Sequence, residues 1–128
     1  MNPDKRKILI VDDDTFLIDM YALKFSQGDF EVYTAPSAKE ALEKIQGGLV
    51  PDMILLDIMM PEMDGFEMLE KMNTDKLATS SIKVILSNKG QQADIDRGHE
   101  LGATDYIIKA TSTPAEVVDK VVAILAKK

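Results

Sequence analysis

The sequence contains no cysteine and only one histidine, His99. Without cysteine the chain can form no disulfide bond, no thiolate zinc site and no cysteine nucleophile. A single histidine excludes metal sites built from several histidines, and it disfavours a histidine-based catalytic triad. We expect His99 itself to be an ordinary surface residue of a helix.

Positive charge is also scarce, since 15 Lys and Arg residues face 22 Asp and Glu residues and leave a net charge of −7. Non-specific nucleic-acid binding needs a basic face, so we expect no nucleic-acid partner. The apolar run after the charged N-terminus is interrupted by three aspartates. It is too short for a signal-peptide core or a membrane span. The sequence therefore predicts a cytoplasmic protein without a membrane partner.

Hydrophobic residues make up 45% of the 128 residues, enough for one domain with its own core. We expect this domain to span residues 1–128 with no effector domain attached. Five strand-like apolar segments alternate with five helix-like segments, a pattern that predicts a parallel sheet covered on both faces. The fold class expected is three-layer α/β/α and flavodoxin-like, with strand order 2-1-3-4-5. The strands are expected at 7–11, 30–35, 53–56, 82–86 and 105–108, and the helices at 15–27, between Ser37 and Gly47, at 66–73, at 92–101 and from Pro114 onward.

Several residues are typical of helix starts. Ser37 with Glu40 three residues later predicts a capping box, and Asp64 is expected to cap the helix at 66–73. Asp14 is expected to be a first-turn acid that complements the helix dipole. The apolar positions of the helix at 15–27 include Leu17, Met20, Tyr21 and Leu23 at nearly helical spacing, although this segment is apolar on nearly all sides.

Polar side chains follow four of the predicted strands. Asp12 and Asp13 come after the first strand, Asp57 ends the third, Ser87 ends the fourth and Lys109 ends the fifth. The carboxyl ends of parallel strands share one edge of a sheet, and ligands of such sheets bind there. Taken alone, Asp12 and Asp13 could simply cap a helix, and Ser87 and Lys109 could be turn residues. Together they predict one pocket.

Three ionised carboxylates in one pocket repel each other, by roughly 4 kcal/mol for a pair about 4 Å apart at an effective dielectric near 20. Lys109 offsets part of this repulsion, and a divalent cation would offset more. A site with few carboxylates, completed by water and a phosphate oxygen, suits Mg²⁺ better than a closed Ca²⁺ cage. Mn²⁺ is expected to substitute.

This combination of groups is suited to phosphoryl transfer. Asp57 is already ionised at neutral pH and could act as a nucleophile that forms an acyl phosphate without a general base. The cation would neutralise the phosphoryl oxygens, while Ser87 and Lys109 would hold the others.

These motifs together resemble the receiver domain of two-component response regulators, most closely a single-domain, chemotaxis-regulator-like member. The resemblance covers nearly the whole chain and includes the aspartate pair, the stretch at 55–65, and the Tyr106-x-x-Lys109 spacing. It implies that Asp57 is phosphorylated by a sensor histidine kinase or a histidine phosphotransfer protein. By the same resemblance, Asp12, Asp13, Asp57 and the backbone carbonyl of Met59 bind Mg²⁺, and Ser87 and Tyr106 form a switch pair.

The resemblance further implies that a downstream protein binds the face formed by the helix at 92–101, the strand at 105–108 and the last helix. The protein is then a signalling phosphoacceptor rather than an enzyme, with at most self-catalysed phosphorylation and dephosphorylation. We expect a monomer, or a weak dimer on activation.

Two residues depart from the family pattern. Asn88 stands where the family usually has a small residue, and it could narrow access to Asp57 or hydrogen-bond the phosphoryl group. Ala110 follows Lys109 where the family usually has proline after a cis peptide bond. A cis bond before a residue other than proline costs about 2.5–4 kcal/mol. We therefore expect either a trans bond or a strained cis bond kept for function.

Three other functions remain open. Asn88 and Ala110 are compatible with a receiver-like interaction module that is never phosphorylated. A flavodoxin-like electron carrier would share the strand order, but three aspartates would repel a flavin phosphate. A phosphatase with an aspartate nucleophile usually has a second aspartate two residues later, where this chain has Met59.

Overall fold

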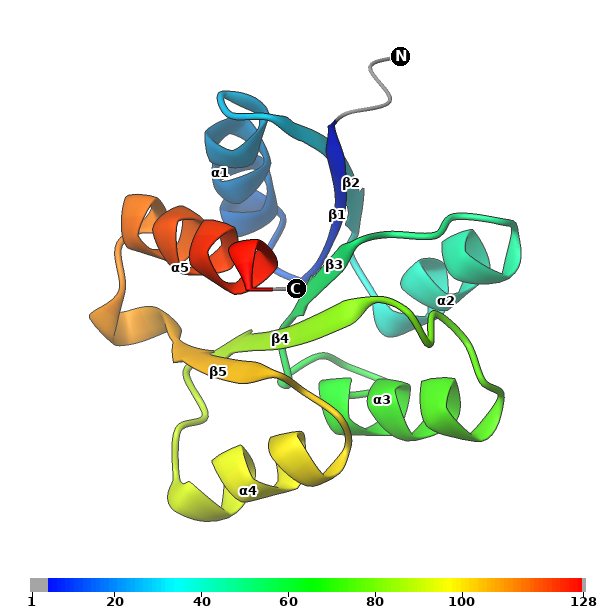
Figure 1. Cartoon of the computed structure of the whole chain (residues 1–128). Coiled ribbons are helices and arrows are strands. Elements are labelled where there is room, and N and C mark those ends of the chain that lie inside the picture. Colours follow the sequence, from blue (N-terminus) through cyan, green and yellow to red (C-terminus); the bar gives the residue numbers. More distant parts are fainter. Residues whose placement is uncertain (1–4, 128) are drawn as a thin grey trace.

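The structure is a computed structural model and describes residues 5–127, which form a single parallel sheet between two layers of helices (Figure 1). The strand order β2-β1-β3-β4-β5 confirms the predicted fold class. The strands are β1 (Arg6–Val11), β2 (Phe30–Ala35), β3 (Met53–Leu56), β4 (Ile82–Ser87) and β5 (Asp105–Ile108). The helices are α1 (Thr15–Ser26), α2 (Ala38–Gln46), α3 (Gly65–Thr74), α4 (Gln92–Glu100), the 3₁₀ turn η1 (Lys109–Thr111) and α5 (Pro114–Ala126).

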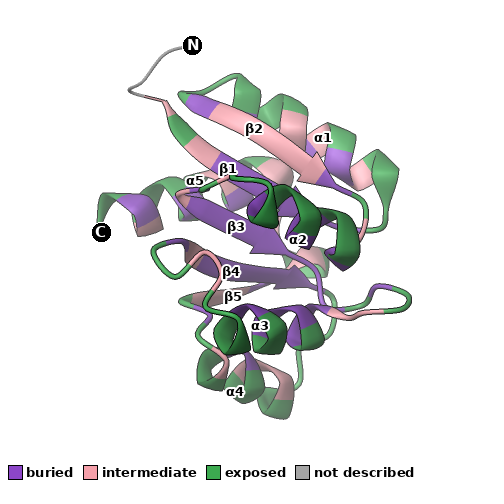
Figure 2. Ribbon diagram, turned by 90° about the vertical axis from the view of Figure 1, so that its right-hand side faces the viewer, coloured by how far each residue is buried: buried purple, intermediate pink, exposed green. Residues whose placement is uncertain are grey.

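Alternating side chains of the strands divide the core between the two faces of the sheet. Ile8 and Ile10 of β1 pack with buried residues of α1 and α5, whereas Leu9 and Val11 pack with those of α2 and α3. The central strand β3 is buried along its whole length (Figure 2). A strand covered on both faces needs apolar side chains in every position, which explains its uninterrupted apolar sequence.

The first turns of the helices agree with the sequence in part. Asp64 caps α3 in a full capping box with Glu67, as the cap prediction required. At α2 only half of the predicted box forms: the Ser37 hydroxyl accepts from the Glu40 N–H at 3.1 Å. No reciprocal bond from the Glu40 side chain occurs among the described residues.

One prediction for α1 is wrong. Asp14 is the N-cap rather than a first-turn acid, because its carboxylate accepts from the N–H groups of Phe16 and Leu17. The buried stripe of α1 runs through Ile18, Tyr21 and Phe25, and Leu23 is 61% exposed. The helix is apolar on nearly all sides, so periodicity could not identify its inward face.

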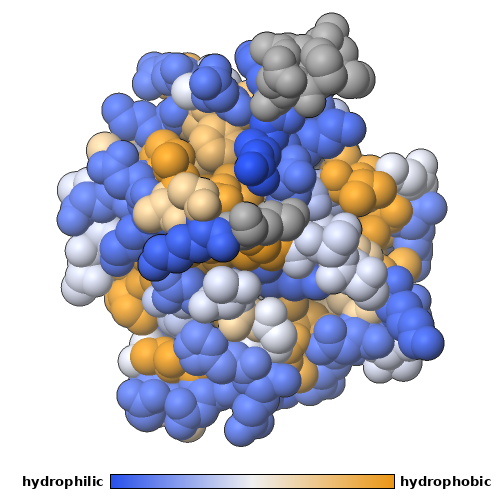
Figure 3. Space-filling view, in the orientation of Figure 1, coloured by the Kyte–Doolittle hydropathy of each residue, from blue (hydrophilic) through white to orange (hydrophobic). Residues whose placement is uncertain are grey.

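The face of the molecule seen in Figure 3 is mostly hydrophilic and carries separate apolar patches. Within residues 5–127, every helix is too short or too polar to cross a membrane.

Candidate functional site

The carboxyl edge of the sheet brings Asp12 and Asp57 together. Strands β1 and β3 are neighbours, with Val11 paired to Leu56, so the residue after each strand lies at the same level. The Asp57 N–H extends this pairing by donating to the Val11 carbonyl at 2.9 Å. Parallel pairing therefore places two aspartates, distant in sequence, side by side.

Asp13 completes an acidic cluster with these two residues. One carboxylate oxygen from each of Asp12, Asp13 and Asp57 lies within 4.8 Å of the others. Asp12 and Asp57 are only 2% and 6% exposed, whereas Asp13 is open to solvent. The cluster is thus anchored at its base and accessible from one side, as a site that binds an ion together with a second ligand requires.

Lys109 provides the cation of the site. It begins η1, directly after β5, and its ammonium lies 2.6 Å from Asp12 Oδ2 and 2.9 Å from Asp57 Oδ2. Three carboxylates and one ammonium leave two negative charges uncompensated. A divalent metal ion would balance them, so the donor set fits Mg²⁺ in both charge and oxygen chemistry.

Burial and hydrogen bonds together shift the pKa values of Asp12 and Lys109. Burial raises the pKa of Asp12, and the hydrogen bonds from Lys109 and from the Asp14 backbone counteract that rise only in part. Burial alone would lower the pKa of Lys109, but its hydrogen bonds to Asp12 and Asp57 outweigh this effect and raise it. Lys109 is therefore firmly protonated at neutral pH, while the charge on Asp12 is incompletely compensated.

Backbone amides orient the Asp57 carboxylate. Its Oδ1 accepts from the Ile58 N–H at 2.7 Å and, more weakly, from the Met59 N–H at 3.3 Å. Gly65, the first residue of α3, allows the loop to fold this tightly: a Cβ there would overlap the backbone oxygen of Asp57. The start of α3 therefore packs directly against the residue that carries the carboxylate.

Ser87 and Tyr106 are connected through the backbone of Lys89. Ser87 is fully buried at the end of β4, and its hydroxyl accepts from the Lys89 N–H at 3.1 Å. The Tyr106 hydroxyl donates to the carbonyl of the same residue. Sequence reasoning missed this junction, because it uses only the main-chain atoms of Lys89 and no side-chain pattern reports it.

The Tyr106 ring is half-buried against α4. Gly98 makes room for it, since a Cβ at that position would lie 3.3 Å from the ring and 2.6 Å from Ile85. Burial raises the pKa of the Tyr106 hydroxyl, and Asp94 adds to the rise. The hydroxyl therefore stays protonated and remains a donor at neutral pH.

The two departures from the family pattern, Asn88 and Ala110, lie beside the acidic cluster. They line a cavity of about 280 Å³ together with Lys109 and Tyr21. The exposed Asn88 side chain makes no hydrogen bond within the part of the chain described. The Lys109–Ala110 peptide bond is trans, the first of the two alternatives expected. His99 is exposed on α4, as predicted.

Comparison with known proteins identifies the family. A family model for the response regulator receiver domain matches residues 8–122. The alkaline phosphatase synthesis transcriptional regulatory protein PhoP of Bacillus subtilis is 36% identical over 122 residues, which are 95% of this chain and 49% of that protein. The chain thus spans about half the length of such curated relatives.

Solved structures show the same fold at nearly full length. A CheY-like receiver domain protein from Methanospirillum hungatei JF-1 has a TM-score of 0.86 and 29% identity, with 97% of this chain and 96% of that chain covered. The chemotaxis protein CheY4 of Vibrio cholerae has a TM-score of 0.85 and 26% identity, covering 94% and 98%. With its acidic cluster at the carboxyl edge of the sheet, the chain belongs to the response regulator receiver domain family of two-component signalling.

Proposed function

We propose that this chain is a Mg²⁺-dependent phosphoacceptor whose nucleophile is Asp57. The observation that carries the proposal is the setting of this carboxylate. Asp57 is only 6% exposed, and it accepts hydrogen bonds from two backbone amides and the Lys109 ammonium. It also belongs to the cluster of three acids. A carboxylate fixed in this way is aligned before the donor arrives, which lowers the entropic cost of attack.

In the proposed reaction an Asp57 carboxylate oxygen attacks the phosphorus of a phosphohistidine on a kinase or phosphotransfer protein. A new O–P bond forms, the P–N electron pair leaves with the donor's ring nitrogen, and this nitrogen takes up a proton from water to give neutral imidazole. Asp12, Asp13, Asp57 and the Met59 carbonyl would hold Mg²⁺, which supplies neutralisation of phosphoryl charge. The Lys109 ammonium, which contacts Asp57 Oδ2, would stabilise the same developing negative charge.

The junction at Lys89 supports a route for the signal. In the described state the Ser87 hydroxyl and the Tyr106 hydroxyl both bind this residue. A phosphoryl group on Asp57 would offer Ser87 a charged acceptor, and charged acceptors form stronger hydrogen bonds than neutral ones. Ser87 would then turn away from Lys89 and free the β4–α4 loop, so that Tyr106 moves inward and the face of α4, β5 and α5 changes.

Phosphorylation can be tested directly by intact-mass spectrometry. The protein is incubated with acetyl phosphate and Mg²⁺, and we expect one added phosphoryl group on the wild type and none on Asp57→Asn. Asp64→Asn is a matched control, because asparagine replaces an aspartate N-cap at little cost. Absence of phosphate on the wild type, with a histidine phosphodonor also supplied, would favour the unphosphorylated interaction module.

The proposal extends to self-catalysed loss of the phosphoryl group. Asn88 borders the cavity next to Lys109 and could hydrogen-bond the phosphoryl oxygens. Replacing Asn88 with alanine should then change the lifetime of the acyl phosphate, measured after the phosphodonor is removed. An unchanged lifetime would remove Asn88 from the site.

A further inference from the structure

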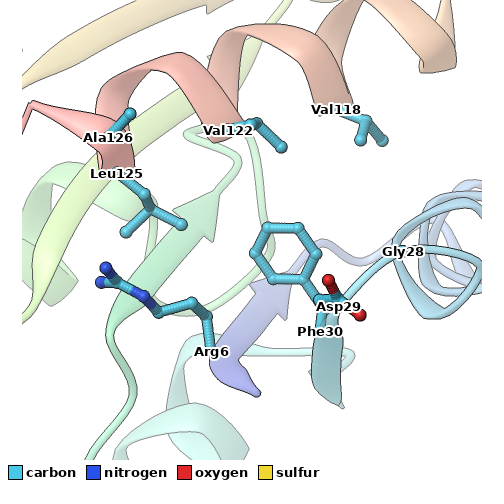
Figure 4. Close-up of a pocket in the computed structure, with 8 residues that line it drawn as sticks. All are labelled: Arg6, Gly28, Asp29, Phe30, Val118, Val122, Leu125 and Ala126. Carbon is cyan, nitrogen blue, oxygen red and sulfur yellow. The ribbon is translucent and has the colours of Figure 1, made fainter. Parts of the chain in front are cut away.

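A second cavity lies at the end of the sheet opposite the acidic cluster. It has a volume of about 320 Å³ and is formed where β1 and β2 begin and α5 ends. Figure 4 shows Phe30 and the α5 side chains facing one another across it. This volume falls within the range of small-molecule sites, which are mostly apolar with a few polar groups. The lining residues are Arg6, Gly28, Asp29, Phe30, Val118, Val122, Leu125 and Ala126.

The apolar walls of this cavity are preformed. Phe30 is only 7% exposed and packs edge-on against Phe25, with ring centroids 5.1 Å apart. Leu125 on the opposite wall is 5% exposed and belongs to the same core cluster. Val122, at the rim, is 48% exposed. A ligand would therefore find rigid walls and a solvated rim, and it would need no rearrangement of the fold.

The mouth of the cavity carries one cation that the fold does not use. Arg6 is exposed, and its guanidinium has no ion pair with any residue of the described chain. In Figure 4 it lies beneath Leu125, while the Asp29 carboxylate points to the other side of Phe30. The cavity lining holds one cation and one anion, Arg6 and Asp29, and the two lie on different sides of the Phe30 ring.

We propose that this cavity binds a small monocarboxylate with an apolar body, of the kind represented by a free medium-chain fatty acid. The apolar part would lie against Phe30 and the α5 side chains, and the carboxylate would pair with Arg6. Guanidinium groups match carboxylates with two parallel hydrogen bonds. The acidic cluster at the opposite edge would repel the same ligand, so the two ends of the molecule select different chemistry. The proposal is independent of phosphorylation.

The test is a titration with octanoate, followed by ¹H–¹⁵N NMR of the full chain. Shifts should concentrate on residues that line the cavity and should be the same in Asp57→Asn. Hexanoate should bind more weakly than octanoate by up to about fourfold per methylene, the equivalent of ~0.8 kcal/mol. Octylammonium, which has the same chain and the opposite charge, should bind more weakly than octanoate.

Two variants, each with a control, test the contribution of the Arg6 charge and that of the apolar walls separately. Arg6→Gln should weaken octanoate binding about fivefold, the upper range for an exposed ion pair, while Lys44→Gln on α2 should leave it unchanged. Val122→Glu should abolish the cavity shifts by placing a like charge on the wall. Ala115→Glu, which adds the same charge at the other end of α5, should not affect them. Each variant is compared at matched thermal stability, so that misfolding is recognised.

Three results would overturn the proposal. One is equal binding of octanoate and octylammonium, and another is a set of shifts spread over the surface. The third is binding of anionic phospholipid vesicles or acidic peptides without binding of free octanoate, since either would identify a macromolecular surface instead.

Discussion

At the scale of single residues, the site is a balance of charge. Lys109 contacts Asp12 and Asp57 at 2.6 and 2.9 Å, but one ammonium cannot neutralise three carboxylates. Burial is the first cause of the raised pKa of Asp12, and the neighbouring charge of Asp57 raises it further. The metal-free protein therefore retains repulsion that binding of a cation would relieve.

This imbalance predicts a pH dependence for Asp12. A carboxyl whose pKa is higher in the folded than in the unfolded state binds its proton more tightly when folded. Its contribution to stability is therefore largest at low pH and decreases as pH rises from about 4 through the raised pKa. In metal-free buffer Asp12→Asn should gain stability over the wild type across this window and keep the gain at neutral pH. Urea unfolding of both proteins from pH 4 to 7 measures this gain. A stability difference between them that does not change with pH would contradict a raised pKa for Asp12.

Tyr106 gives a second prediction at this scale. Tyr106→Phe removes the hydrogen bond to the Lys89 carbonyl and should cost about 0.5–1.5 kcal/mol of unfolding free energy. Asp57 should still accept phosphate, whereas the NMR shifts of α4 on phosphorylation should shrink. Tyr33→Phe on β2 is the control. A full α4 response in Tyr106→Phe would remove this hydroxyl from the switch.

At the scale of elements, strand ends and helix starts position the chemistry. Parallel pairing of β1 with β3 sets the level of the two buried aspartates, and α3 begins against the Asp57 backbone. The loops between these elements are therefore tightly constrained, even though loops are usually the variable part of a fold.

Gly65 tests this constraint. In Gly65→Ala the new methyl group would overlap the Asp57 carbonyl, so α3 or the loop must shift, at a cost of about 1–3 kcal/mol. Phosphorylation should also slow, because the shift displaces the nucleophile. Gly28→Ala is the matched control: its methyl group would meet only ordinary contacts at 3.6 Å and 3.8 Å. Equal stability of the two variants would show that α3 does not hold Asp57.

The sequence predicted the elements that have a clear pattern of apolar residues. The predictions failed where no such pattern exists or where the structural feature involves only a few residues. The uninterrupted apolar run of β3 and the acids behind it were readable, because burial on both faces leaves a strong composition signal. The inward face of α1 could not be predicted, since this helix is apolar on nearly all sides. Nor could sequence reveal that Ala78 adopts a positive φ of 50° while its carbonyl binds the buried Lys83 ammonium.

At the scale of the whole molecule, metal binding should act as a stabilising ligand. A cation bound only by the folded state raises the free energy of unfolding by about 1.4 kcal/mol at ten times its dissociation constant. For a domain of this size that corresponds to a rise in melting temperature of roughly 4–6 °C.

Variants within the aspartate run at 12–14 locate this effect. Asp13→Asn should reduce the rise in melting temperature with Mg²⁺, because it removes a proposed ligand. Asp14→Asn should retain the rise, since Asp14 caps α1 and asparagine caps a helix as well as aspartate does. An unchanged wild-type melting curve at millimolar Mg²⁺ would be incompatible with a metal site.

The most direct measurement locates the phosphoryl group itself. After reaction with acetyl phosphate and Mg²⁺, fragment-mass spectrometry should find the modification on the peptide that contains residues 51–65 and assign it to Asp57. The modification should disappear when Mg²⁺ is chelated, and it should not move to another residue in Asp57→Asn. A phosphoryl group on a different side chain, or the same yield without Mg²⁺, would contradict the proposed role of the acidic cluster.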